Sequence, residues 1–276
     1  MQLSVDTVGE LLGGCGLARI DAEVLLAHLI GRSRTWLVAH ADDPLPAADV
    51  QRFEAVARRR LAGEPVAYLT GRREFHGLAL DVGPAVLIPR PETETLVDVA
   101  LARIPRQGSP RVLDLGTGSG AVALAIAHAR PEARVYACDA SSEALAVAHA
   151  NAQRLQLGNL RFFVSDWFAS APALAFDVVV ANPPYIAAGD PHLATGDLRF
   201  EPALALSPGG DGLGALRIIV ADAPRHLVAG GVLAVEHGFD QAGPVRAMFA
   251  DAGFLAVVTH ADLAGHARVT SGDARG

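Results

Sequence analysis

The chain has 276 residues, of which 51% are hydrophobic and 19% charged, and its formal net charge is -7. This length and apolar content suffice for one large α/β domain and a smaller one. The acidic balance, with arginine as the only strongly basic residue type, argues against direct binding of a nucleic-acid backbone. No apolar run reaches membrane-spanning length and Met1 to Glu10 lack a signal-peptide pattern, so we expect a cytoplasmic protein with no membrane partner.

Cysteine and histidine usage bears on metals and disulfides. Cys15 and Cys138 are the two cysteines, and their wide separation excludes a disulfide framework and a cysteine metal cluster. We expect both to be buried and structural. The ten histidines show no metal-ligand spacing, so the sequence predicts no bound metal.

Residues 1–74 form a predicted helical domain that holds the substrate. Apolar residues recur there at helical spacing in three stretches, and a glycine follows the second and third stretches, as is typical at a helix C-terminus. The apolar positions are Leu3, Val8, Leu11 and Leu12; Ala22, Leu25, Leu26, Leu29 and Ile30, before Gly31; and Val50, Phe53, Val56 and Leu61, before Gly63.

Residues 75–91 differ from the helical stretches that precede them. Glycines and prolines punctuate short β-favouring runs at 78–82 and 86–88. This pattern predicts a β-hairpin that links two domains.

Residues 92–276 form a predicted Rossmann-like domain, because strand and helix patterns alternate after residue 108. Such alternation indicates a parallel sheet with crossover helices. The stretch 187–212 carries three prolines and is interpreted as a cover over the substrate site. The expected strands are 112–115, 134–138, 160–164, 176–181, 232–236 and 255–260, and the expected helices are 121–129, 142–155, 213–228 and 244–252.

A glycine-rich turn lies between the first strand and helix of this alternation. It reads Gly116-Thr117-Gly118-Ser119-Gly120, and Asp139 ends the next strand. The glycines let a ligand approach the backbone, and free N–H groups at the helix start favour an anion. An acidic side chain at the position of Asp139 accepts hydrogen bonds from ribose hydroxyls. By itself this turn also fits hydride transfer with a nicotinamide cofactor.

The sequence Asn182-Pro183-Pro184-Tyr185 directly follows the apolar run 176–181. Two prolines hold the Asn182 carboxamide and the Pro183 carbonyl rigidly as two acceptors, and Tyr185 adds a flat face. An amide nitrogen is a poor nucleophile, and two acceptors that bind its hydrogens direct its lone pair toward an electrophile. Together with the glycine turn and Asp139, this motif indicates methyl transfer to nitrogen.

At these motifs the chain resembles the bacterial peptide chain release factor N(5)-glutamine methyltransferases of the PrmC/HemK family. The resemblance extends over nearly the whole chain. It is carried by Asp21-Ala22-Glu23, Gly63-Glu64-Pro65, Leu69-Thr70-Gly71, Glu74-Phe75, Leu87-Ile88-Pro89-Arg90-Pro91-Glu92-Thr93-Glu94, Ser165-Asp166-Trp167-Phe168 and Arg199-Phe200-Glu201-Pro202. The stretch from Pro89 to Glu94 is the most diagnostic. The match is looser at 262–270 and is lost after Ser271.

The resemblance implies a cofactor, a substrate and roles for particular residues. The cofactor is S-adenosyl-L-methionine, with Gly116 to Gly120 around its methionine end, Asp139 on its ribose and Trp167 by its adenine. The substrate is the glutamine of the Gly-Gly-Gln loop of a class 1 release factor, lying against Asn182, Pro183, Pro184 and Tyr185. Asn182, Pro183 and Tyr185 are the implied catalytic residues, and Asn182 also touches the cofactor.

Other functions and several roles stay open at this point. A glutamine in a ribosomal large-subunit protein is an alternative acceptor, adenine in DNA is a weaker one, and a cofactor-binding adaptor without catalysis is a third alternative. Asp166 either bonds the adenine amino group or caps a turn. Arg90 and Glu92 either line the site or form an ion pair that braces the linker.

Overall fold

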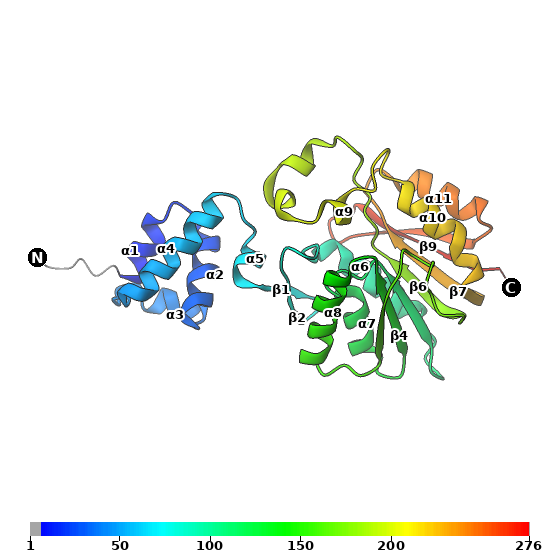
Figure 1. Cartoon of the computed structure of the whole chain (residues 1–276), viewed down its shortest axis with the longest axis horizontal. Helices are drawn as coiled ribbons and strands as arrows, with labels where there is room; N and C mark the ends of the chain where they lie inside the picture. Colours follow the sequence, from blue (N-terminus) through cyan, green and yellow to red (C-terminus); the bar gives the residue numbers. More distant parts are fainter. Residues whose placement is uncertain (1–6, 276) are drawn as a thin grey trace, which may run out of the picture. The chain divides into compact units, whose positions relative to one another are not determined.

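The computed structural model describes residues 7–275 and divides the chain into two compact units, Met1–Arg72 and Arg73–Gly276 (Figure 1). Leu3, which we expected in the first helix, lies outside the described residues. Among residues 7–275, no helix is both long enough and apolar enough to cross a membrane.

The first unit is helical. A capping box between Thr7 and Glu10 begins its first helix, and Gly31 ends its second in the left-handed conformation. These helices and the expected third one are confirmed, but two shorter helices were missed because one or two turns show no clear periodicity. The helices are α1 (Val8–Gly14), α2 (Arg19–Ile30), α3 (Arg34–Ala39), α4 (Ala47–Leu61) and α5 (Val66–Thr70).

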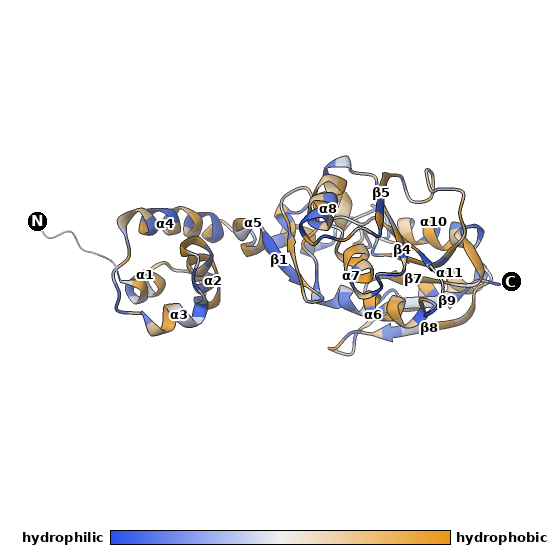
Figure 2. Ribbon diagram, turned by 90° about the horizontal axis from the view of Figure 1, so that it is seen from below, coloured by the Kyte–Doolittle hydropathy of each residue, from blue (hydrophilic) through white to orange (hydrophobic). Residues whose placement is uncertain are grey.

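Apolar faces of these helices form a core of their own. Phe53 of α4 is fully buried with Leu25 and Leu26 of α2. Figure 2 shows hydrophilic and hydrophobic segments alternating along α4, as expected for a helix with one buried face. Cys15 is only partly buried at the edge of this core, so the expectation that it is buried was wrong.

The hairpin comprises β1 (Arg72–Phe75) and β2 (Leu78–Asp81), joined by His76 and Gly77 with positive φ. The expected strand at 86–88 is not formed. The Ile88 N–H donates to the carboxylate of Glu201 at 3.0 Å instead of to a neighbouring strand. A short 3-10 helix, η1 (Pro91–Thr93), then leads into α6 (Glu94–Arg103).

The main sheet of the second unit has seven strands within the described residues, in the order β5-β4-β3-β6-β7-β9-β8. The five strands from β5 to β7 are parallel, as expected, whereas β9 pairs antiparallel with both β7 and β8. We did not expect β9, which falls where the family resemblance weakens. The strands are β3 (Arg111–Leu115), β4 (Arg134–Asp139), β5 (Leu160–Val164), β6 (Phe176–Ala181), β7 (Leu227–Glu236), β8 (Leu255–Ala261) and β9 (Ala267–Asp273).

Helices cover both faces of this sheet (Figure 1). One face packs against α6, α7 (Ala121–Ala129) and α8 (Ser142–Arg154), and the other against α10 (Gly214–Asp222) and α11 (Ala242–Asp251). Helix α7 is buried along most of its length and is mostly orange in Figure 2. Helix α10 ends before the expected residue 228 because Pro224 interrupts it within η4 (Ala223–Arg225).

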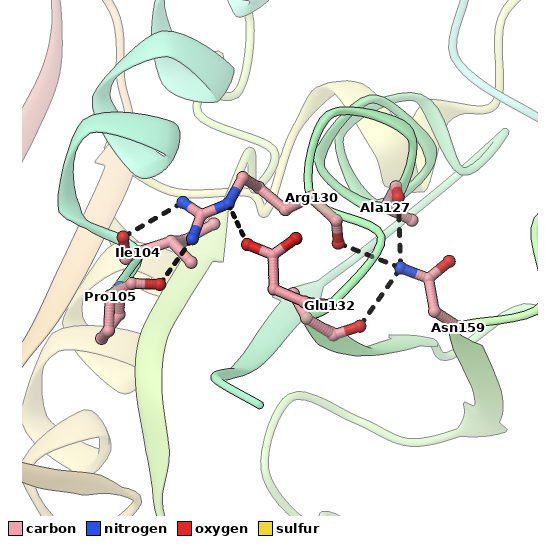
Figure 3. A network of polar contacts seen from close by, with 7 residues as sticks. Ile104, Pro105, Ala127, Arg130, Glu132 and Asn159 are labelled. Carbon is pink, nitrogen blue, oxygen red and sulfur yellow. Dashed lines mark hydrogen bonds and ion pairs between the residues drawn. The ribbon is translucent and has the colours of Figure 1, made fainter. Parts of the chain in front are cut away.

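Polar contacts fix the loops at the amino ends of the strands (Figure 3). The Nδ2 group of Asn159 donates to the carbonyls of Ala127, Arg130 and Ala133 at 3.1 to 3.2 Å. The Arg130 guanidinium bonds to the Ile104 carbonyl at 3.1 Å. This network lies at the amino ends of the strands. It stabilises the loops there and is remote from the carboxyl ends, where parallel sheets bind ligands.

Candidate active site

A cavity of about 380 Å³ lies at the carboxyl ends of β3, β4 and β6, entirely within the second unit. This is the edge where parallel sheets bind ligands. The predicted site residues that line it come from four segments and are Gly116, Gly118, Asp139, Trp167, Asn182 and Pro184.

The glycine turn needs its glycines for backbone geometry. Gly116, Gly118 and Gly120 all have positive φ, which other residues adopt only with strain. A Cβ built on Gly118 would meet no atom within 4 Å, so the backbone there faces open space. A Cβ on Gly120 would lie 2.9 Å from Leu124, so this glycine serves packing against α7.

Thr117 and Ser119 are buried and face the protein interior. The Thr117 hydroxyl donates to Asp114 at 2.6 Å, and the Ser119 carbonyl accepts from Asn151 at 3.1 Å. These two residues therefore shape the turn from behind rather than line the cavity.

The buried carboxylate of Asp114 lies beside the N-terminus of α7. Asp114 accepts from the Thr117 hydroxyl and lies near the Ala123 N–H, and its complete burial raises its pKa to about 7. The Gly118 N–H is not free, because it donates to Asp139 at 2.9 Å. The expectation that free N–H groups here hold an anion is therefore wrong for Gly118.

Asp139 ends β4 and lines the cavity. Its two carboxylate oxygens accept from the N–H groups of Gly118 and Ser141, both at 2.9 Å. These bonds fix the carboxylate at the cavity wall, and each oxygen keeps a further lone pair for a ligand hydroxyl. The arrangement is compatible with the predicted contact to ribose.

Trp167 and Asp166 lie side by side in the cavity lining. Trp167 has a φ of 48°, and its ring approaches within 3.3 Å of a Cβ placed on Gly116. The carbonyl of Trp167 accepts from the Ser165 hydroxyl at 2.8 Å, which holds the turn. An indole fixed against bare backbone offers a flat surface for a planar ring.

Cys138 is buried behind this turn. Its Sγ donates to the Trp167 carbonyl at 3.5 Å, and burial raises the pKa of the thiol to about 12. A thiol that does not ionise near neutrality fits the structural role predicted for it.

A second, smaller cavity of about 70 Å³ adjoins the first. Its lining includes Asn182, Pro183, Pro184 and Tyr185, together with Glu236. Asn182 and Pro184 line both cavities, so the motif stands between them. The smaller cavity has room for a few heavy atoms, such as those of a carboxamide.

Tyr185 is held at both ends. Its hydroxyl donates to Glu236 Oε1 at 3.1 Å, and its carbonyl accepts from Gln241 Nε2 at 2.9 Å. Burial and the neighbouring carboxylate raise the pKa of Tyr185, so the phenol stays protonated. Tyr185 therefore acts as a fixed neutral wall of the small cavity.

The segment 187–212 contributes to both cavities, as expected for a cover. It contains η2 (Pro191–Ala194), η3 (Gly196–Phe200) and α9 (Ala203–Leu206). Leu204 is 89% exposed, although it lines the large cavity. The buried carboxylate of Glu201 ties the segment to the region after the hairpin through the Ile88 N–H and an ion pair with Arg90. The partner of Arg90 is thus Glu201 and not Glu92.

Two buried residues beside the small cavity were missed in the sequence. The Thr93 hydroxyl accepts from Asn182 Nδ2 at 3.1 Å, and Glu236 accepts from Tyr185. The sequence could have indicated both as candidate site residues, because Thr93 lies in the most diagnostic motif and Glu236 ends a parallel strand. Nothing in the sequence indicated that they meet Asn182 and Tyr185.

The cavity fits the cofactor that the sequence led us to expect. It combines an indole and aliphatic side chains with the carboxylates of Asp139, Glu143 and Asp166. Apolar walls suit an adenine ring, fixed carboxylates suit hydroxyl groups, and an acidic lining suits a sulfonium cation.

Comparisons with known proteins agree with this geometry. Residues 10–71 match the PrmC N-terminal domain family, and residues 92–213 match the methyltransferase small domain family. The release factor glutamine methyltransferase of Burkholderia pseudomallei (strain K96243) is 54% identical over 96% of this chain and 95% of its own length. The protein of the same name from Xylella fastidiosa (strain Temecula1) is 52% identical over 93% of each chain.

The solved structure of a methyltransferase from Pyrococcus furiosus shares the fold, with a TM-score of 0.54 and 17% identity over 79% of this chain and 97% of that one. The expected Rossmann-like methyltransferase domain and the family resemblance are both confirmed. The chain belongs to the release factor glutamine methyltransferase family.

Proposed function

We propose that this chain transfers a methyl group from S-adenosyl-L-methionine to the side-chain amide nitrogen of the glutamine in the Gly-Gly-Gln motif of class 1 release factors. The observation that carries the proposal is the position of Asn182, which lines both the large cavity and the small one. A residue shared by a cofactor-sized and a carboxamide-sized cavity can align the two reacting groups. The proposal places the reaction in the cytoplasm, where release factors act.

The large cavity would hold the cofactor. Asp139 would accept from the ribose hydroxyls, Trp167 would cover the adenine, and Gly116 and Gly118 would let the methionine end approach the backbone. When bound, S-adenosyl-L-methionine supplies an electrophilic methyl group on a sulfonium. Thr117, Ser119 and Gly120 would act only through the shape of the turn.

The small cavity would hold the glutamine carboxamide. Asn182 Oδ1 and the Pro183 carbonyl would each accept one N–H of the substrate amide, and Tyr185 and Pro184 would confine its plane. With both hydrogens bound, the nitrogen lone pair points out of the amide plane toward the large cavity.

The chemistry needs position rather than a base. Asn182 Oδ1 and the Pro183 carbonyl would direct the substrate nitrogen toward the methyl group that S-adenosyl-L-methionine would supply, and the electron pair of the broken carbon–sulfur bond would remain on sulfur. The alkylated amide is strongly acidic and loses one N–H proton to water. Asn182, Pro183 and Tyr185 therefore act by orientation and by stabilising positive charge that develops on nitrogen.

A transfer assay with defined acceptors tests the proposal. The purified chain is incubated with methyl-labelled S-adenosyl-L-methionine and, separately, with a class 1 release factor, ribosomal large subunits and duplex DNA. We expect label on the release factor alone, and mass mapping should place it on the glutamine of Gly-Gly-Gln. A release factor with that glutamine replaced by alanine is the matched control.

Each other outcome has a definite meaning. Label on a ribosomal protein or on adenine would show that the chain methylates that acceptor instead, and would refute the proposal. No turnover with any acceptor, despite measurable cofactor binding, would favour a binding adaptor.

A further inference from the structure

Thr93 is a buried threonine whose hydroxyl is used in an unusual way. It is 4% exposed and directly precedes α6, the position where threonine side chains commonly cap a helix. The Thr93 side chain makes no cap hydrogen bond to α6. Its hydroxyl oxygen instead accepts from Asn182 Nδ2 at 3.1 Å, across 89 residues of sequence.

The Thr93 hydroxyl also has a hydrogen to donate, and the buried carboxylate of Glu236 lies beside it. Glu236 is 1% exposed, and the neighbouring Thr93 and Tyr185 hydroxyls both favour the ionised form of its carboxylate. Glu236 Oε1 accepts from Tyr185, while Oε2 has no close hydrogen-bond partner in residues 7–275. Above its pKa of about 7 the Glu236 carboxylate is ionised and only accepts, so it favours donation from the Thr93 hydroxyl.

This arrangement determines which way the Asn182 carboxamide faces. The Asn182 carboxamide presents its NH₂ group to the Thr93 oxygen. A Thr93 hydroxyl that donates to an ionised Glu236 can only accept from Asn182, so it favours this orientation. Oδ1 then lies on the opposite side of the carboxamide. A flipped carboxamide would face the Thr93 lone pairs with an oxygen and offer the substrate amide a donor in place of an acceptor.

We propose that Thr93 and Glu236 are positioning residues that hold the Asn182 carboxamide with its oxygen available to the substrate amide. The inference rests on the proposed function, since it assigns Asn182 Oδ1 to the substrate nitrogen. Neither residue would contact the reacting atoms. They act by excluding the unproductive orientation of Asn182.

Two substitutions at Thr93 separate its hydroxyl from its methyl group. Thr93→Val keeps the shape and removes the hydroxyl, whereas Thr93→Ser keeps the hydroxyl and removes the methyl. At pH 8, where Glu236 is ionised, we expect Thr93→Val to lower kcat about tenfold with little change in cofactor Kd, and Thr93→Ser to stay within about twofold of the wild type. Thr270→Val is the matched control, because it removes another fully buried hydroxyl, bonded to His237, outside both cavities.

Glu236 is tested by coupling to Thr93. We expect Glu236→Gln to lower kcat severalfold, because an amide can donate as well as accept and no longer dictates the direction of the Thr93 hydrogen. The kcat of the Thr93→Val/Glu236→Gln double variant should be little lower than that of the less active single variant, because both changes remove the same interaction that orients Asn182. Denaturant unfolding of every variant reports losses of stability separately.

The outcomes distinguish this inference from the proposed function. If the wild type fails to methylate the glutamine, the proposed function itself fails. If the wild type is active, the inference is overturned by an unchanged kcat in Thr93→Val, by a Thr93→Ser variant as poor as Thr93→Val, or by fully additive losses in the double variant. If Thr93→Val does not fold, the three remaining variants decide. The inference then requires kcat to fall in Glu236→Gln and to stay near the wild-type value in Thr93→Ser and Thr270→Val.

Discussion

Replacing Asn182 with alanine gives the most direct test of how the site works. The substitution removes Oδ1, one of the two acceptors assigned to the substrate amide, and leaves the Pro183 carbonyl in place. It also leaves the Thr93 hydroxyl without its donor. The change is small in volume, so the walls of both cavities keep their shape.

The expected loss follows from the number of acceptors. Removing one of two preorganised hydrogen-bonding groups at a reacting centre costs about a hundredfold in kcat, or about 2.7 kcal/mol in activation free energy. Loss of one partly buried hydrogen bond to Thr93 should lower the free energy of unfolding by about 1 kcal/mol. Cofactor Kd should change by less than about threefold, because Asp139 and Trp167 remain.

The assay measures methyl transfer to a class 1 release factor at saturating cofactor, with cofactor Kd from calorimetry. Asn159→Ala is the matched control: it also removes an asparagine carboxamide, one whose Nδ2 bonds three carbonyls at the opposite edge of the sheet. This control should lose stability and keep its kcat. If Asn182→Ala turned over as fast as the wild type, the assignment of Asn182 as an acceptor for the substrate amide would be refuted.

Three further predictions concern the cofactor cavity, the glycine turn and the pH dependence of stability. Trp167→Ala should weaken cofactor binding about tenfold with a smaller effect on kcat, and an unchanged Kd in calorimetry would exclude the adenine contact. Gly120→Ala should lower the free energy of unfolding by about 2 kcal/mol, measured with denaturant, because the new Cβ would lie 2.9 Å from Leu124 at a φ of +85°. Burial raises the pKa of Glu236 from its usual 4.5 to about 7, so the folded state keeps a proton that the unfolded state releases. Its contribution to stability is therefore full below about pH 4.5 and is lost as the pH rises through about 7. Unfolding at pH 5 and pH 8 should show Glu236→Gln gaining stability relative to the wild type at the higher pH, and an equal difference at both values would contradict the shift.

The sequence alone determined the features that depend only on residues close together along the chain. Apolar spacing predicted the parallel strands and most of the larger helices, because each periodicity records which face of an element is buried. The ten-residue helix α6 was missed. The glycine turn and Asn182 to Tyr185 were recognisable because their function depends on local backbone geometry. Short elements such as α3 and α5 were missed, since their few residues carry too little periodicity.

Only the tertiary structure decided how the chain's polar groups are paired. Asn182 meets Thr93 across 89 residues, and Arg90 meets Glu201 across 111. The structure also showed that the Gly118 N–H is used by Asp139. No local pattern encodes such pairs, because a side chain's partner depends on which strands and loops the folded core brings together and on which polar groups burial leaves in need of a hydrogen bond.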